Sequence, residues 1–207
     1  MAGGNYPGPI NDLGPPVGID GGTLARAEMP LPGPIGLQAG GGATGPTDLG
    51  AKVVSYARGK IGKKAGDGQC FALVDRALRD AGAKSAADFG KVTPDADYVW
   101  GNAVGLADVR PGDIIQFRNY RYDRTIKTES KTEIRTDTEF QERQHHTAII
   151  ESVDGNGAIT VLEQNVPDGG SGQRNQLFFS KFDSTSGGKT TTIKVKGRFR
   201  FYRPQPR

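Results

Sequence analysis

The chain has 207 residues, a formal net charge of +4 and a pI near 9.2. This length can bury a core without disulfides or metals, and the basicity is too slight to indicate nucleic acid as a partner by itself. The single cysteine excludes an intramolecular disulfide framework.

No segment comes near the ~18 consecutive apolar residues that a transmembrane helix requires. The first residues, MAGGNYPGPINDLG, have neither the basic nor the apolar region of a Sec signal peptide. We therefore expect a cytoplasmic protein without a membrane span, or one that is exported by a non-Sec route.

Glycine and proline dominate the beginning of the chain. Residues 1–50 contain 14 of the 31 glycines and 8 of the 13 prolines. Such a composition cannot bury enough apolar surface to offset the loss of chain entropy. We predict a disordered leader over residues 1–46, acting as a spacer or carrying a short docking motif, and one domain over residues 47–207.

Two amphipathic helices are predicted at the start of this domain. The first begins at Thr47 or Asp48, either of which can cap a helix, and ends at KKAGDGQ. The second runs from about Cys70 to Ala81, with Gly82 as its C-cap. Apolar residues recur at helical spacing in both, namely Leu49, Val53, Tyr56, Ala57 and Ile61 in the first and Phe71, Val74, Leu78 and Ala81 in the second.

Strand patterns follow the helices. The stretch DVRPGDIIQFRN indicates a turn, held by Asp113, and a strand from Asp113 to Arg118. HHTAIIESVDGNGAITVLEQNV is typical of a hairpin with DGNG as its turn, and KTTTIKVKGRFRFYRP predicts at least one further strand. Helices followed by antiparallel strands indicate an α+β fold class.

Residues 118–145 form an extended charged insertion. The segment RNYRYDRTIKTESKTEIRTDTEFQERQ contains seven Lys/Arg and six Asp/Glu residues. We predict a long, solvent-exposed β-ribbon with opposite charges facing each other across its strands. A flap over a substrate groove is the functional alternative.

Cys70 is either a small buried apolar residue or a nucleophile. In the first turn of a helix, unpaired backbone N–H groups and the helix dipole stabilise a thiolate. A thiolate nucleophile also needs a general base, usually histidine, and the chain has only His145 and His146. Because side chains alternate along a strand, only one of these two rings can face Cys70.

The base needs an orienting group on its second ring nitrogen. Glu163 and Asn165 lie two residues apart in ITVLEQNV, so we expect both to project from the same face of the strand. With DGNG as the turn, paired residues have numbers that sum to about 311. This register places His146 opposite Asn165, with Glu163 diagonally along the ladder, and either group is within reach.

At these residues the chain resembles a known family. GDGQCFALVDRALRDAGA, RPGDIIQF and HHTAIIESVDGNGAITVLEQN are similar to the CHAP domain, a branch of the NlpC/P60 papain-like superfamily. The segments YVWG, RPGDIIQFR and HHTAII…LEQNV more closely resemble an offshoot of this fold in fungal actin-patch proteins and plant hydroxyproline-rich proteins.

The resemblance implies a papain-like fold in which N-terminal helices pack on a small antiparallel sheet. It also implies that Cys70 is the nucleophile, His146 the base, and Glu163 with Asn165 the orienting pair. The Cys70 backbone N–H, with Gln69, would bind the oxyanion. Trp100 in YVWG is either core or groove wall, and we carry it as a candidate substrate-binding residue.

The implied reaction is cysteine-dependent hydrolysis of a peptide or peptidoglycan amide through an acyl-thioester. No cofactor is expected, and no metal, because GDG at residues 66–68 is too sparse for an oxygen cage. We expect a monomer.

Other functions are compatible with the same sequence. One is a non-catalytic interaction module that retains the fold. Another is a secreted effector amidase with an immunity partner. The basic and aromatic alternation of KVKGRFRFYRPQPR could follow a nucleic-acid backbone, but a solvated sheet edge explains it as well, and we expect no nucleic-acid partner.

Overall fold

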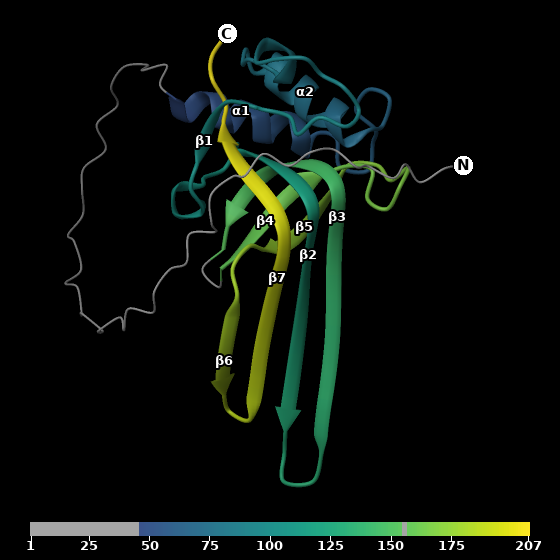
Figure 1. Ribbon diagram of the computed structural model, residues 1–207, viewed down its shortest axis with the longest axis vertical. Helices are drawn as coiled ribbons and strands as arrows, with labels where there is room; N and C mark the ends of the chain where they lie inside the picture. Colours follow the sequence, from purple (N-terminus) through teal and green to yellow (C-terminus); the bar gives the residue numbers. More distant parts are fainter. Residues whose placement is uncertain (1–45, 155–156) are drawn as a thin grey trace, which may run out of the picture. The chain divides into compact units, whose positions relative to one another are not determined.

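A seven-stranded sheet with two helices on one face makes up the described part of the chain in the computed structural model (Figure 1). The structure describes residues 46–154 and 157–207, so the predicted leader lies outside the described residues except at its last position. The helices are α1 (Pro46–Arg58) and α2 (Cys70–Asp80), with short 3-10 turns at Ala86–Asp88 and Leu106–Asp108. The strands are β1 (Asn102–Val104), β2 (Ile114–Glu129), β3 (Ile134–Val153), β4 (Ala158–Glu163), β5 (Gln173–Phe178), β6 (Phe182–Ser186) and β7 (Lys189–Arg203).

The sheet is antiparallel throughout. Its strands lie in the order β1-β7-β2-β3-β4-β5, and β6 pairs with β7. The α+β prediction agrees with this arrangement, but the expected small sheet is wrong. β2, β3 and β7 are 16, 20 and 15 residues long, because β7 continues beside β2 to the end of the charged segment.

Alternation along the central strands builds a core on each face of the sheet. Ile114 and Ile149 face the helices and pack with α1, α2 and Trp100. Their neighbours Ile115 and Ile150 face the other way. The second core is rich in aromatic rings, among them Phe117, Tyr120, Phe179, Phe199 and Phe201.

A turn between the 3-10 segment and β2 joins the sheet to α1. Asp113 is buried, accepts the backbone N–H of Arg110 at 3.0 Å and receives two hydrogen bonds from Arg203. Gly112 has a φ of +88°, and a Cβ there would lie 2.3 Å from the Cα of Gly50 in α1. Asp113 thus holds the turn as expected, and only glycine fits at position 112.

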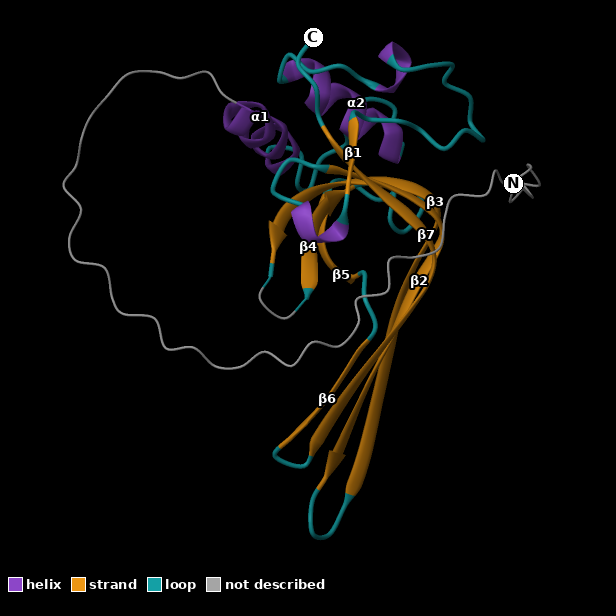
Figure 2. Ribbon diagram, turned by 60° about the vertical axis from the view of Figure 1, so that its left-hand side comes forward, coloured by secondary structure: helices purple, strands orange, loops and turns teal. Residues whose placement is uncertain are grey.

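The outer halves of β2, β3 and β7 extend with β6 away from the helices as a narrow four-stranded sheet, here called the arm (residues 120–143 and 182–196; Figures 1 and 2). The β2 and β3 halves occupy the segment expected as a charged ribbon. Opposite charges face each other across these strands, as in the pairs Arg124–Glu139 and Arg121–Glu142. The sequence did not predict that β6 and β7 would lie beside the ribbon.

Candidate active site

Cys70 is the first residue of α2, and its side chain is partly exposed. As the first helical residue it has a backbone N–H with no partner inside the helix. The buried side chain of Gln164 fixes the segment before it. The Gln164 amide donates to the carbonyls of Ala65 and Gln69 and accepts the N–H of Ala65. This contact ties the start of α2 to the residue after β4.

His146 reaches the site from β3 and is buried. Its imidazole lies close enough to the Cys70 thiol for each group to shift the pKa of the other. His145 points elsewhere, with its Nε2 2.8 Å from the carbonyl oxygen of Ala96 and its ring against Tyr98. The two adjacent histidines therefore diverge, as strand alternation requires, and His146 faces the cysteine.

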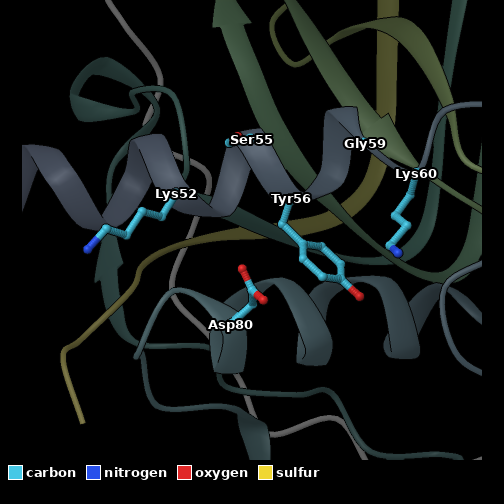
Figure 3. Close-up of a pocket in the computed structure, with 6 residues that line it drawn as sticks. All are labelled: Lys52, Ser55, Tyr56, Gly59, Lys60 and Asp80. Atoms are coloured by element: carbon cyan, nitrogen blue, oxygen red, sulfur yellow. The ribbon is translucent and has the colours of Figure 1, made fainter.

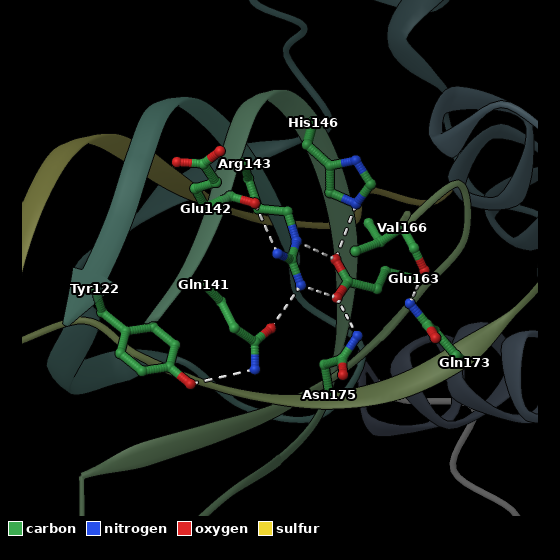
Figure 4. Close-up of polar contacts among 9 residues, drawn as sticks. All are labelled: Tyr122, Gln141, Glu142, Arg143, His146, Glu163, Val166, Gln173 and Asn175. Atoms are coloured by element: carbon green, nitrogen blue, oxygen red, sulfur yellow. Dashed lines mark hydrogen bonds and ion pairs between the residues drawn. The ribbon is translucent and has the colours of Figure 1, made fainter. Parts of the chain in front are cut away.

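Glu163, the last residue of β4, supplies the carboxylate beside the imidazole (Figure 4). Its Oε2 lies 2.9 Å from the Nε2 of His146, and its side chain is fully buried. Because Nε2 faces Glu163, Nδ1 is the ring nitrogen that remains for Cys70. Residues 70, 146 and 163 thus form a continuous cysteine–histidine–carboxylate sequence of contacts.

A buried arginine completes the surroundings of Glu163 (Figure 4). Both ends of the Arg143 guanidinium donate to this carboxylate, the Nε at 2.8 Å from Oε2. Asn175 on β5 donates to Oε1 at 2.8 Å. Arg143 also donates to the side-chain oxygen of Gln141, whose amide donates to the hydroxyl of Tyr122 at the base of the arm.

These contacts shift all three ionisations toward a thiolate–imidazolium pair. Burial alone would raise the pKa of Cys70, but hydrogen bonding to His146, its positive charge and the backbone N–H groups of Thr147 and Phe71 lower it overall. Burial likewise opposes a charge on His146, yet its bonds to Cys70 and Glu163 raise its pKa to about 9. Burial of Glu163 is outweighed by Arg143 and His146, which hold its pKa well below the usual range.

The site balances its own charges. The Cys70 thiolate offsets the His146 imidazolium, and the Glu163 carboxylate offsets the Arg143 guanidinium. Removing one member of such a buried set leaves an uncompensated charge, which is costly. The arrangement favours the thiolate form of Cys70 and can pass a proton through the imidazole.

A protein-family model described as the AIM3/BBC1 cysteine proteinase-fold domain matches residues 44–184. The chain belongs to this family. The match contains Cys70, His146 and Glu163, and it confirms the expected cysteine-proteinase fold of fungal actin-patch proteins. Comparison with curated proteins and with solved structures finds no match.

Two expected site residues of this AIM3/BBC1-family chain lie elsewhere. Asn165 was expected to orient His146, and that prediction is wrong. β4 ends at Glu163, Asn165 has a left-handed φ of 65°, and its amide donates to the Gln69 side chain instead. Trp100 is 0% exposed and donates to Gln116 at 3.2 Å. It therefore lies in the core, which was one of its two expected places, and its candidate role in binding substrate is wrong.

Gln69 directly precedes Cys70 and is exposed. It is the N-cap of α2, and its Oε1 accepts from Asn165 at 3.2 Å. The Gln69 Nε2 is therefore directed away from Asn165. It remains a candidate oxyanion donor together with the Cys70 N–H.

Three residues that position this site in the AIM3/BBC1-family fold were not among the predicted site residues, namely Arg143, Gln164 and Asn175. Arg143 lies in a run of alternating charges that reads as solvated, and nothing in that run distinguishes it. Gln164 stands between Glu163 and Asn165 in LEQNV, and strand alternation places such a residue on the opposite face. Its position next to the Glu163 carboxylate was the one feature of the sequence that could have indicated a place near the site.

Other features of the described part bear on ligands. An open pocket of about 350 Å³ lies between α1 and α2 (Figure 3), lined by Lys52, Ser55, Tyr56, Gly59, Lys60 and Asp80, none of which belongs to the site. Residues 46–154 and 157–207 contain no group of three or more His, Cys, Asp or Glu side chains arranged to hold a metal ion. No helix within these ranges is long and apolar enough to span a membrane.

Proposed function

We propose that this chain is a cysteine-dependent amide hydrolase of CHAP type that acts through an acyl-thioester. The observation that carries the proposal is the convergence of Cys70, His146 and Glu163 from three separate segments, with Cys70 at a helix N-terminus. A structural cysteine requires neither a lowered pKa nor a buried imidazole with its own carboxylate.

Acylation begins with the Cys70 thiolate attacking the carbonyl carbon of the amide, which forms a C–S bond. The carbonyl oxygen takes up negative charge near the Cys70 N–H and the Gln69 side chain. The His146 imidazolium then donates its proton to the amide nitrogen, the C–N bond breaks and the amine leaves. Glu163 keeps its charge throughout and holds the ring in position.

Deacylation uses the neutral His146 that remains. It accepts a proton from water, whose oxygen attacks the thioester carbonyl and displaces the Cys70 sulfur as a thiolate. The carboxylic acid product leaves, and the imidazolium–thiolate pair is restored with atoms and charges balanced. Peptides and peptidoglycan amides are the substrate classes that the CHAP resemblance suggests.

The test compares the wild-type chain with the Cys70→Ser variant. Both are incubated with a defined peptide library and with muropeptides, and the products are identified by mass spectrometry. We expect cleavage by the wild type only. A small activated ester provides a substrate-independent control, since a catalytic Cys70 should give a burst of product and a covalent acyl adduct in the intact mass.

Absence of both cleavage and the acyl burst would contradict the hydrolase. The non-catalytic interaction module would then be the better account of the fold. Acylation without cleavage of either pool would retain the chemistry and exclude those two substrate classes.

A further inference from the structure

The arm carries a long strand edge that no neighbour covers within the described ranges. Residues 134–142 of β3 pair only with β2, since β4 joins β3 from Ile149 onward. The β2–β3 register stays constant from the pair Ile114–Ile149 to the pair Glu129–Ile134. The two strands therefore have no bulge between them. Proteins usually protect such edges with charged residues, proline or bulges. IRTDTEFQE has no proline and no bulge against β2, so its protection is limited to the charges of Arg135, Asp137, Glu139 and Glu142.

The same edge carries the two most exposed large apolar side chains in the described residues. Ile134 is 65% and Phe140 is 53% exposed. They lie six residues apart on one strand, so both project from the same face of the arm. The guanidinium of Arg121 sits 3.9 Å from the centre of the Phe140 ring and supports it from the neighbouring strand.

The hairpin at the tip determines which peptide groups point outward. Ser130 donates its N–H to the carbonyl of Glu133 at 2.8 Å, so these two residues form a hydrogen-bonded pair. Hydrogen-bonded and non-hydrogen-bonded pairs alternate along an antiparallel ladder. Counting from this pair, the peptide groups of residues 135, 137 and 139 face β2, and those of residues 134, 136, 138 and 140 face outward.

We propose that a second copy of this chain pairs with this edge, antiparallel, about a two-fold axis at Asp137. Paired residues then have numbers that sum to 274. Ile134 of one copy faces Phe140 of the other, and Arg135 faces Glu139. Symmetry makes each contact twice, and the interface closes on itself rather than growing into a fibre.

The residue on the axis carries a cost, because like charges directly opposite each other are destabilising, and Arg135 reduces that cost. The two Asp137 side chains face each other as a non-hydrogen-bonded pair, and Arg135 of the same chain already donates to each of them at 2.9 and 3.1 Å. Shifting the axis by one residue, to residue 138, would bring Asp137 opposite Glu139 and Ile134 opposite Glu142. The opposite edge of the arm, β6, offers only five residues. The edge at 134–142 is therefore the self-complementary one.

Charge reversal tests the register. Sedimentation velocity of the full chain over about a hundredfold range of concentration should show a dimer of 22.0 kDa protomers that dissociates on dilution. Arg135→Glu places glutamate opposite Glu139, and Glu139→Arg places arginine opposite Arg135, so each variant alone should be monomeric. An equimolar mixture of the two should dimerise, because both contacts become opposite-charge pairs again.

A wild type that remains monomeric throughout would overturn the proposal. So would dimeric single variants, or a mixture that fails to associate although circular dichroism shows both variants folded.

Cross-linking tests the axis without altering these charges. In the Cys70→Ser background, Asp137→Cys places a thiol opposite its own copy, and side chains of such a pair lie about 4.5–5.5 Å apart at Cβ. Mild oxidation should give a disulfide-linked dimer. Lys131→Cys at the exposed hairpin tip is the matched control and should not cross-link. Equal cross-linking of the two, or none at residue 137, would contradict the two-fold pairing.

Discussion

Replacing Glu163 by glutamine removes one charge from the centre of the site while keeping the size of the side chain. The structure raises the pKa of His146 from 6.5 to about 9, and each pKa unit corresponds to about 1.4 kcal/mol. The imidazolium is therefore favoured by about 3 kcal/mol, shared between Cys70 and Glu163. We expect the Glu163→Gln variant to lower the pKa of His146 by at least about one unit.

The same substitution should also destabilise the fold. Arg143 is buried and directs both ends of its guanidinium at Glu163. Removing the partner of a buried charge typically costs about 3–5 kcal/mol. Chemical denaturation measures this loss, and NMR titration of the imidazole protons measures the pKa, since the chain has only two histidines.

Glu151 provides a matched control. It is a second buried carboxylate, on β3, and it pairs with Arg58 and Arg174. Those two arginines are about half exposed and can regain water. Glu151→Gln should therefore cost less stability and leave the pKa of His146 unchanged. An unchanged His146 pKa in Glu163→Gln would refute the electrostatic reasoning.

Three further predictions follow from the same geometry. Because its pKa is raised in the folded state, protonated His146 contributes to the free energy of unfolding. This contribution is complete below pH 6.5 and is lost as the pH rises through about 9. Chemical denaturation at a series of pH values should show this loss in the wild type and not in His146→Gln. Asn165→Ala should leave the pKa of His146 unchanged by NMR, because Asn165 contacts Gln69, and a fall of a full unit would restore its orienting role. Gly112→Ala should lower the thermal midpoint, since the new Cβ meets Gly50 backbone at 2.3 Å; an unchanged midpoint would show that α1 can shift at no cost.

The chemistry of the site could be read from the sequence because it depends on local rules. The helix begins at Cys70, where the pattern placed it. Ile149 pairs with Leu162 and Ile150 with Val161, which gives the predicted sum of 311. A register shift between Ile150 and Ser152 moves the pairs nearer the turn to a sum of 312, and residues 155 and 156 of DGNG lie outside the described residues. The register of the Ile149 and Ile150 pairs put Glu163 within reach of His146.

What could not be predicted depends on where strands end and how distant elements pack. The left-handed backbone at Asn165 stops the alternation of β4, so the two-residue spacing from Glu163 no longer places both side chains on one face. Trp100 is enclosed by Phe71 and Tyr98, contacts that only the tertiary fold creates. Arg143 is buried because β3 enters the core at this position, although the residues before it on the strand are mostly exposed.

The pH dependence of Cys70 alkylation tests the central claim most directly. Iodoacetamide reacts with the thiolate, the chain has one cysteine, and intact mass spectrometry counts the adduct. If Cys70 and His146 form an ion pair, the wild-type rate should already be high at pH 6 and vary little up to pH 8, whereas His146→Gln should need higher pH. A wild-type rate that instead rises with a single pKa near the ordinary thiol value of about 8.5 would contradict the account.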